Sequence, residues 1–181
     1  MAIYTLFNKS GEQKELLLRR CTIHDVPDIL MLQDQVEAAL PDRHIFVKTT
    51  DIEIRESILL DYCVGAFDQG NLAGFTLMIY GRVTPRNLGT YFGYGEEQLR
   101  GCVTYDTAFV DPCCRGFGLQ RLFSSLRNEE AIRCGAREAF ATVSPDNLAS
   151  LKNTLANGFE IVETRIMYTG VVRHILRKTF T

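Results

Sequence analysis

Apolar and polar residues alternate in short runs along most of the chain, and these runs predict its strands. Seven β-rich segments are bounded by turn residues such as glycine, asparagine and proline. They cover residues 16–22, 62–67, 72–80, 102–110, 139–143, 159–168 and 172–178. Residues 2–7 are either a further edge strand or part of a loose N-terminal segment that extends to residue 14.

Apolar residues at helical spacing predict four helices between these strands. The first begins after Asp25, which we expect to cap it, and stops at Pro41. The second begins at Thr50 and Glu53, which form a capping-box pattern. The other two are expected at 117–134 and at 147–157, each followed by a glycine.

This order of elements predicts one domain of the α/β (mixed α+β) class over residues 1–181. A helix that joins strand 102–110 to strand 139–143 makes those two strands parallel, whereas short turns join antiparallel neighbours. We therefore expect a central mixed sheet of six or seven strands with helices on both faces. In such sheets, ligands bind at the carboxyl ends of the strands.

Composition narrows the class of protein and its location. A net charge of −2 argues against a general nucleic-acid or membrane-surface binder. The six cysteines have no CxxC spacing, so we expect reduced thiols in a cytoplasmic protein. The N-terminus lacks the pattern of a signal peptide, and no apolar run approaches the ~20 residues of a membrane span. Whether Cys113 or Cys114 is reactive stays open.

The stretch FVDPCCRGFGLQRLFSSLR, residues 109–127, joins a strand to an amphipathic helix through two closely spaced glycines. Gly116 and Gly118 allow a tight turn, and the unpaired amides at the helix start lie at the positive end of its dipole. This combination favours binding of a phosphate. A purely structural turn is the alternative.

Two loops are long enough to form the walls of a binding site. Residues 41–49 contain His44 and Phe46, and residues 81–101 contain Tyr91 and Tyr94. Three dispersed histidines provide no spacing typical of a metal site, so we expect no metal.

Two motifs resemble those of the GNAT superfamily of acyl-CoA-dependent N-acyltransferases. The first is the family's V-x-P-x-x-R-G-x-G pattern, here Val110 to Gly118. The second is the later N-x-x-(small)…G-F pattern, here Asn147, Ser150, Gly158 and Phe159. The order of elements agrees with the family from about residue 16 to residue 178.

The resemblance implies acetyl-CoA as the acyl donor and implies which residues hold it. The pyrophosphate of coenzyme A would bind to the turn and helix start. The residues implied there are Arg115, Gly116, Phe117, Gly118, Leu119, Gln120 and Arg121. Its pantetheine arm would lie beside Phe109 and Val110, whose backbone would also polarise the thioester carbonyl. Asn147 and Ser150 would contact the same arm, although Asn147 is equally a helix cap. Gln120 departs from the glycine or alanine that most members have.

The chemistry of the family requires a base and a proton donor. Asp106 is our candidate base, because it is a lone charge in an apolar strand. Glu138, His44 and a relayed water remain as alternatives. The tyrosine that many members use as proton donor is Thr154 here, and Tyr168 is our candidate substitute.

The sequence thus predicts an N-acetyltransferase that moves an acetyl or short acyl group to a primary amine by direct attack. The acceptor is an unidentified small molecule or peptide, and a homodimer is left open. A catalytically idle acyl-CoA-binding sensor is the alternative, because the usual tyrosine is missing.

Overall fold

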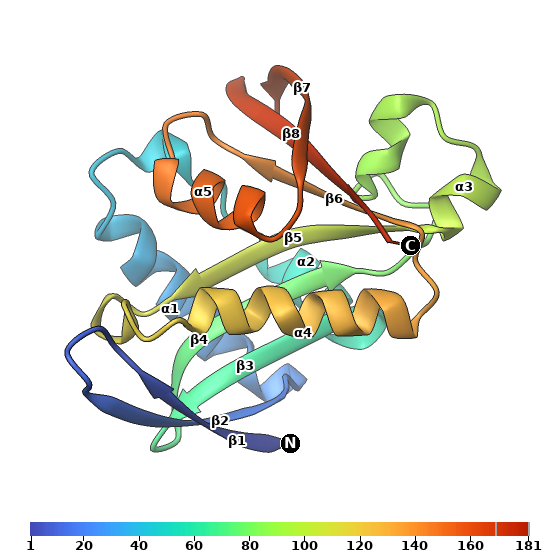
Figure 1. Cartoon of the computed structure of the whole chain (residues 1–181). Coiled ribbons are helices and arrows are strands. Elements are labelled where there is room, and N and C mark those ends of the chain that lie inside the picture. The colour runs from blue at the N-terminus through green and yellow to red at the C-terminus, as the bar shows by residue number, and fades with distance from the viewer. Residues whose placement is uncertain (169, 181) are drawn as a thin grey trace. The chain divides into compact units, whose positions relative to one another are not determined.

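The computed structural model describes residues 1–168 and 170–180 (Figure 1). Its described strands form one sheet of eight, in the order β1-β2-β3-β4-β5-β6-β8-β7. The expected mixed sheet is confirmed, with more strands than the six or seven predicted, because residues 2–7 form a paired edge strand rather than a loose terminus.

The strands agree closely with the runs predicted from the sequence. They are β1 (Ala2–Phe7), β2 (Gln13–Arg20), β3 (Tyr62–Asp68), β4 (Asn71–Ile79), β5 (Cys102–Val110), β6 (Glu138–Val143), β7 (Glu160–Met167) and β8 (Val171–Thr179). β5 and β6 are parallel, with Cys102 opposite Glu138 and Tyr105 opposite Ala141, as the connecting helix required. β7 and β8 form the closing antiparallel hairpin.

Five α-helices lie among the described residues. They are α1 (Val26–Ala38), α2 (Asp51–Leu60), α3 (Glu96–Arg100), α4 (Leu119–Arg133) and α5 (Leu148–Ala156). The short helix α3 and a 3₁₀ turn at Leu88–Phe92 were not predicted, because residues 81–101 show no apolar period. The long helix starts at Leu119 rather than at residue 117, since Gly118 has a left-handed backbone that no α-helix contains.

The capping predictions had different outcomes at the first two helices. At α2, the Thr50 hydroxyl accepts from the Glu53 amide, and the Glu53 carboxylate accepts from the Thr50 amide. Asp25 was expected to cap α1, and its side chain makes no such bond. Its carboxylate instead accepts from both terminal nitrogens of Arg19.

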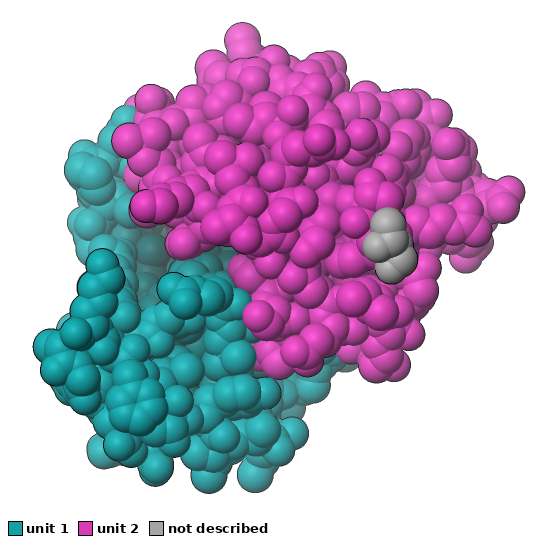
Figure 2. Space-filling model, in the orientation of Figure 1, with its two compact units in different colours: residues 1–43, 48–77, 107–123 teal, residues 44–47, 78–106, 124–181 magenta. Residues whose placement is uncertain are grey.

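The described residues group into two compact units (Figure 2). Unit 1 consists of residues 1–43, 48–77 and 107–123, and unit 2 consists of residues 44–47, 78–106 and 124–181. β5 contributes to both, since Asp106 belongs to unit 2 and Thr107 to unit 1.

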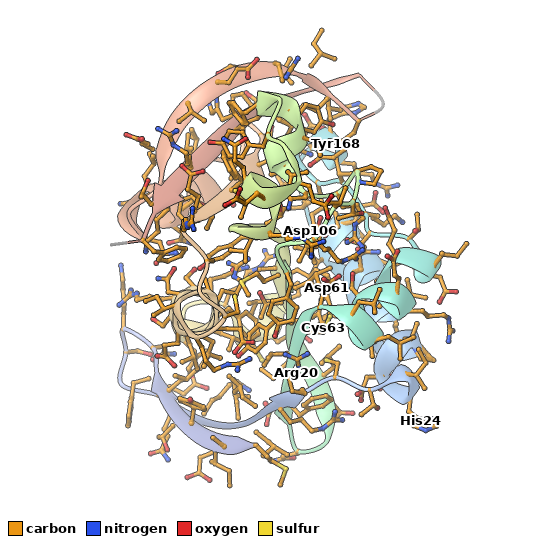
Figure 3. All side chains as sticks on the ribbon, turned by 90° about the vertical axis from the view of Figure 1, so that its right-hand side faces the viewer. Arg20, His24, Asp61, Cys63, Asp106 and Tyr168 are labelled. Atoms are coloured by element: carbon orange, nitrogen blue, oxygen red, sulfur yellow. The ribbon has the colours of Figure 1, made fainter. Side chains whose placement is uncertain are left out.

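In unit 1, α1 and α2 lie on one side of the sheet and the start of α4 on the other (Figure 3). Leu119 and Phe123 of α4 are buried against β4, where Gly74 leaves room for both side chains. Phe75 of β4 also contacts Phe109 of β5, with ring centroids 5.5 Å apart. This packing fixes the end of β5 and the beginning of α4, the two elements that flank the glycine turn.

In unit 2, a second core lies beneath the 3₁₀ turn at 88–92. It contains Leu88, Cys102, Phe140, Met167 and Ile175, with Phe92, Tyr94 and Val162 packed against it. The 81–101 segment is therefore anchored by apolar packing. No helix in the described part of the chain is long and apolar enough to cross a membrane.

Candidate functional site

The glycine turn in unit 1 has the backbone that its sequence predicts. Gly116 and Gly118 have φ values of +87° and +81°, which non-glycine residues rarely adopt. A Cβ built on either would have no neighbouring atom within 4 Å, so both positions face open space. The turn thus keeps room for a ligand directly beside the backbone.

The first backbone bonds of α4 show which amides remain for such a ligand. The amides of Arg121 and Leu122 both donate to the Gly118 carbonyl, at 3.0 Å. The amides of Gly118 and Leu119 precede these bonds, at the positive end of the helix dipole. Arg121 therefore offers a ligand its exposed side chain rather than its amide. The Arg115 side chain is exposed as well.

Gln120, the residue that departs from the family pattern, points back to the strand. Its Nε2 donates to the Ala108 carbonyl of β5 at 3.2 Å. The bulky side chain is thus directed away from the turn, as its position beside a phosphate site would require. Phe109 and Val110, which follow Ala108, are both buried.

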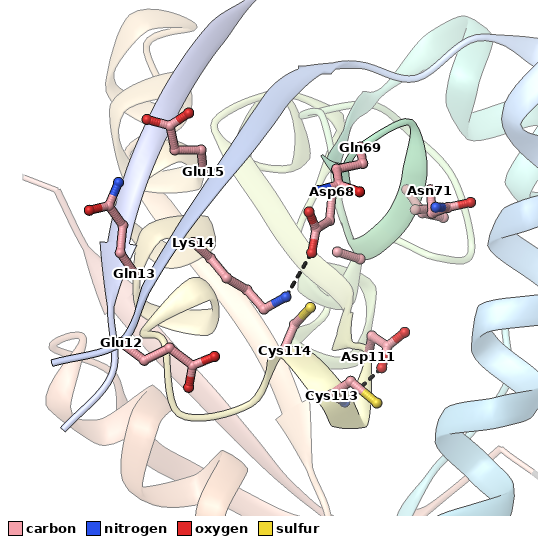
Figure 4. Close-up of a pocket in the computed structure, with 12 residues that line it drawn as sticks. Glu12, Gln13, Lys14, Glu15, Asp68, Gln69, Asn71, Asp111, Cys113 and Cys114 are labelled. Atoms are coloured by element: carbon pink, nitrogen blue, oxygen red, sulfur yellow. Dashed lines mark hydrogen bonds and ion pairs between the residues drawn. The ribbon is translucent and has the colours of Figure 1, made fainter. Parts of the chain in front are cut away.

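Buried contacts hold the turn from the β2 side. Cys114 is buried, and Phe117 is buried beneath the Lys14 ammonium, whose Nζ lies 5.7 Å from the ring centroid. Lys14 also forms an ion pair with Asp68 at 2.7 Å. Lys14, Asp68 and Cys114 border an open depression of about 550 Å³ (Figure 4).

The depression has the wrong charge for a phosphate group. Four carboxylates line it and only Lys14 opposes them. The carboxylates are Glu12, Glu15, Asp68 and Asp111. Burial raises the pKa of the Cys114 thiol, so this sulfur stays protonated at neutral pH, while Cys113 is exposed. The depression is therefore not a phosphate site, and Cys114 is not an activated thiol.

Asp106 of unit 2 lies on the face of β5 that the 82–92 segment covers. Its neighbour on that face, Thr104, accepts a hydrogen bond from the Leu88 amide at 3.1 Å. Arg86 of the same segment donates to Asp106 Oδ2 at 3.0 Å. The lone charge that the sequence singled out is thus mostly buried and has a cationic partner.

Tyr168 lies just after β7, with a left-handed backbone at φ +52°. Its hydroxyl is 2.9 Å from the Thr142 hydroxyl of β6. The positions of Tyr168 and Asp106 can be followed in Figure 3. Tyr168 is 51% exposed, yet desolvation of its hydroxyl raises the pKa of the phenol, while the hydrogen bond with Thr142 lowers it and the charge of Asp106 raises it. The phenol therefore keeps its proton at neutral pH and is able to donate it.

In the second motif, Asn147 and Ser150 form hydrogen bonds within α5, and so does the nearby Thr154. Asn147 caps α5, because its Oδ1 accepts from the Ser150 amide at 3.1 Å. Thr154, at the usual tyrosine position, donates its hydroxyl to the Ser150 carbonyl at 2.9 Å. That bond occupies the Thr154 proton, so the structure agrees with the poor acidity expected of threonine at this place.

The residues predicted to bind the acceptor fall into two groups. His44 and Tyr91 are exposed, and Phe46 is partly exposed. The Arg165 guanidinium lies 5.2 Å from the Tyr91 ring centroid. Tyr94 instead packs on Phe140.

The hydroxyl of Tyr94 donates to Glu138 Oε2 at 3.0 Å. Glu138, an alternative base, begins β6 and pairs in register with Cys102, four residues before Asp106 on β5. Four residues of strand span about 13 Å, so the Tyr94–Glu138 pair is separate from Asp106.

Two buried polar features are not evident from the sequence. In unit 1, Gln33 of α1 exchanges two hydrogen bonds with the backbone of Thr49, whose hydroxyl contacts that of Thr107 in β5. In unit 2, Arg173 of β8 is only 5% exposed and bonds the Ile45 carbonyl at 3.0 Å. Both residues occupy ordinary positions in amphipathic elements, so no local pattern marks them.

Metal ligands were not expected, and no group of three or more metal-binding side chains occurs among residues 1–168 and 170–180.

Comparisons with known proteins identify the fold. No family model matches the chain, and no curated protein matches it in sequence. A solved GNAT-family acetyltransferase from Streptococcus pneumoniae is similar, with a TM-score of 0.69 and 18% identity over 92% of this chain and 99% of that one.

Two further solved structures have the same fold. One is yncA of Salmonella typhimurium, a proposed acetyltransferase with acetyl-CoA bound, at TM-score 0.67 and 18% identity over 92% of this chain and 94% of that one. The other is the ribosomal-protein-alanine N-acetyltransferase of Brucella melitensis, at TM-score 0.67 and 23% identity over 91% of this chain and all of that one. The chain therefore has the GNAT fold, as its two motifs predicted.

Proposed function

We propose that the chain is an N-acetyltransferase that transfers an acetyl or short acyl group from acetyl-CoA to a primary amine. The observation that supports this most directly is the course of β5. This strand presents Asp106 midway and leads, after Val110, into the open left-handed turn at Gly116 and Gly118. A candidate base and a candidate phosphate site thus follow one another along a single strand.

The turn fits the phosphates of coenzyme A. The amides of Gly118 and Leu119 would bind the pyrophosphate at the start of α4, with Arg115 and Arg121 adding charge. The backbone of Phe109 and Val110 would pair with the pantetheine arm. When bound, acetyl-CoA supplies the activated acyl group as a thioester.

Asp106 and Tyr168 would perform the two proton transfers. An amine with a pKa of about 10 is mostly protonated at neutral pH, so a base must remove a proton before it attacks. Asp106 would accept this proton while Arg86 holds its carboxylate in place. Tyr168, whose raised pKa keeps its phenol neutral, would donate a proton to the departing sulfur. A Val110 amide would stabilise the developing oxyanion.

The alternative is a non-catalytic acyl-CoA-binding protein, and one observation favours it. The hydroxyl of Thr154 donates to the Ser150 carbonyl, so this residue does not offer its proton where many members of the family have a tyrosine as proton donor. We infer a single domain and a cytoplasmic location in either case. The absence of disulfides between the six cysteines supports the location, because such thiols are typical of a reducing compartment.

Release of free thiol from acetyl-CoA separates the two functions. The protein would be assayed with amines, polyamines, amino acids and peptide N-termini, and acetyl-CoA binding would be measured in parallel by calorimetry. We expect at least one acceptor to accelerate thiol release, and Asp106→Asn to abolish most of that acceleration. Binding of acetyl-CoA without acceleration by any acceptor would favour the sensor instead.

A further inference from the structure

Arg173 is a buried cation in unit 2 with most of its hydrogen-bonding capacity unused. It lies on β8 and is 5% exposed. Its Nη1 donates to the Ile45 carbonyl at 3.0 Å, whereas its Nε and Nη2 are buried and have no partner among the described residues. No ion pair in the described part of the chain includes it.

This state is energetically unfavourable for the protein alone. Removing a charged group from water requires a paired charge or a full set of hydrogen bonds. Burial lowers the pKa of the Arg173 guanidinium, which shows the same cost. A buried cation with unpartnered donors is therefore suited to binding an anionic ligand.

In two other arginines of unit 2, other contacts offset the cost of an unpartnered Nε. Arg127 is also buried with an unpartnered Nε, but its guanidinium lies 4.5 Å from the centroid of the Tyr105 ring. Arg177 has an unpartnered Nε too, and it forms ion pairs with Glu160 and Glu138. Arg173 has neither an aromatic ring nor a carboxylate among its described contacts.

The two free groups of Arg173 have the geometry that an oxyanion recognises. Nε and Nη2 are adjacent on the planar guanidinium, and their N–H bonds point in parallel. A carboxylate binds such a pair with both of its oxygens. The Ile45 carbonyl occupies only Nη1, so it leaves this pair free.

Arg173 contacts the segment that contains residues predicted to bind the acceptor. Ile45 lies between His44 and Phe46 in the segment predicted to wall the acceptor site. Thr142, whose hydroxyl is 2.9 Å from that of Tyr168, is opposite Ile175 of β8. Arg173 is two residues from Ile175, so its side chain points to the same face of the sheet as Thr142. β8 also pairs with the end of β6, where His174 is opposite Val143, and ligands bind at such carboxyl ends.

We infer that the acceptor is an amino acid, whose carboxylate binds Nε and Nη2 of Arg173 while its amine faces Asp106. This inference rests on the proposed acetyl transfer. Peptide N-termini, which lack a carboxylate next to the amine, and simple amines would be poorer acceptors. A purely structural Arg173, which only anchors the Ile45 segment, predicts no such preference.

The test compares each α-amino acid with its own amide, which keeps the side chain and the amine but removes the negative charge. The variants are Arg173→Met, Arg173→Lys and, as a matched control on the same strand, Arg177→Met. The readouts are the ratio of kcat/KM for acid over amide, from thiol release, and the equilibrium binding of the acid by calorimetry without acetyl-CoA.

For the wild type we expect a preference for the acid of about tenfold or more, since a hydrogen-bonded charge pair is lost with the amide. Arg173→Met should reduce this ratio to about one, Arg173→Lys should keep part of it, and Arg177→Met should keep all of it. A wild type without preference, or an Arg173→Met variant that loses acid and amide equally, would overturn the inference.

The two readouts separate this inference from the proposed function. Arg173-dependent binding of amino acids without thiol release would refute acetyl transfer and support the carboxylate site. Thiol release with amines and amides, but with no binding of amino acids, would support acetyl transfer and refute the carboxylate site. Absence of both binding and release would refute the carboxylate site as well.

Discussion

Arg86 Nη2 donates to Asp106 Oδ2 at 3.0 Å, so the candidate base is held by a cation from the segment that covers its strand. Both side chains are mostly buried, at 16% and 23% exposed. The pair fixes the direction of the carboxylate, and a base must be held in such a fixed position to remove a proton from a bound amine.

Asp106→Asn should lower kcat/KM at pH 7 by about 10²-fold or more, since an amide cannot accept the proton. The loss should shrink above pH 9, where an increasing fraction of an amine with a pKa of about 10 is already neutral. A pH–rate profile measures this. Asp146→Asn, on an exposed position of unit 2, is the control, and an unchanged profile in Asp106→Asn would remove Asp106 from the mechanism.

Tyr168→Phe should lower kcat by a factor on the order of 10² if the phenol protonates the departing sulfur. Since burial raises the pKa of Tyr168 above its usual value of 10, wild-type kcat should not fall from loss of this proton below pH 10. Thr154→Val should leave kcat unchanged, because the threonine hydroxyl is bonded to Ser150. A large loss of kcat in Thr154→Val, with little change in Tyr168→Phe, would identify Thr154 as the proton donor instead.

Gly118→Ala should weaken coenzyme A binding about tenfold or more, because its Cβ would enter the open space beside the turn. Gly11→Ala is a matched control, with a φ of +83° and equally open surroundings in the β1–β2 turn. Both substitutions carry a similar backbone cost of about 1–2 kcal/mol. Calorimetry with coenzyme A should therefore distinguish them, and equal affinities would argue against a phosphate site at the turn.

Gln120→Ala should tighten coenzyme A binding by up to about tenfold, the value of one net hydrogen bond. The Gln120 side chain now occupies the Ala108 carbonyl, on the strand edge predicted to pair with the pantetheine arm. Removing it would free that carbonyl for the ligand. Weaker binding would show that Gln120 braces the turn instead.

Asp25→Asn should destabilise the protein by roughly 2–3 kcal/mol at pH 7. The Arg19 hydrogen bonds lower the pKa of Asp25 to about 2, below its unfolded value of about 3.9. Its contribution is therefore complete above pH 4 and is lost as the pH falls through 2.

Denaturant titrations of wild type and variant at several pH values check this, and the two curves should converge near pH 2. The control Asp28→Asn, on the exposed face of α1, should change stability by no more than about 0.5 kcal/mol. A constant difference between Asp25→Asn and wild type at all pH values would contradict an electrostatic origin.

Local sequence patterns were sufficient to predict most of the fold and the glycine turn. Strand 102–110 was predicted with both of its ends, because apolar β-formers stop at Gly101 and Pro112. Gly116 and Gly118 were recognised by a backbone requirement that glycine alone meets easily. These features depend on near neighbours in the chain, which a sequence displays directly.

Partners that are distant in sequence could not be predicted. Asp106 was conspicuous as a charge in an apolar strand, yet Arg86 comes from a segment without a period. Arg173 fits the alternation of a closing strand, and its burial becomes evident only with Ile45, 128 residues earlier. Asp25 satisfied the rule for a helix cap, but Arg19 on β2 provided a stronger partner than the helix amides.

The edge strand β1 has a consequence for how the protein behaves at high concentration. It pairs with β2 along its whole length, from Ala2 opposite Leu18 to Phe7 opposite Gln13. A chain shortened by these residues would present the bare backbone of β2, and such an edge recruits strands from other molecules. Truncation before residue 8 should therefore promote aggregation while leaving both proposed ligand sites intact.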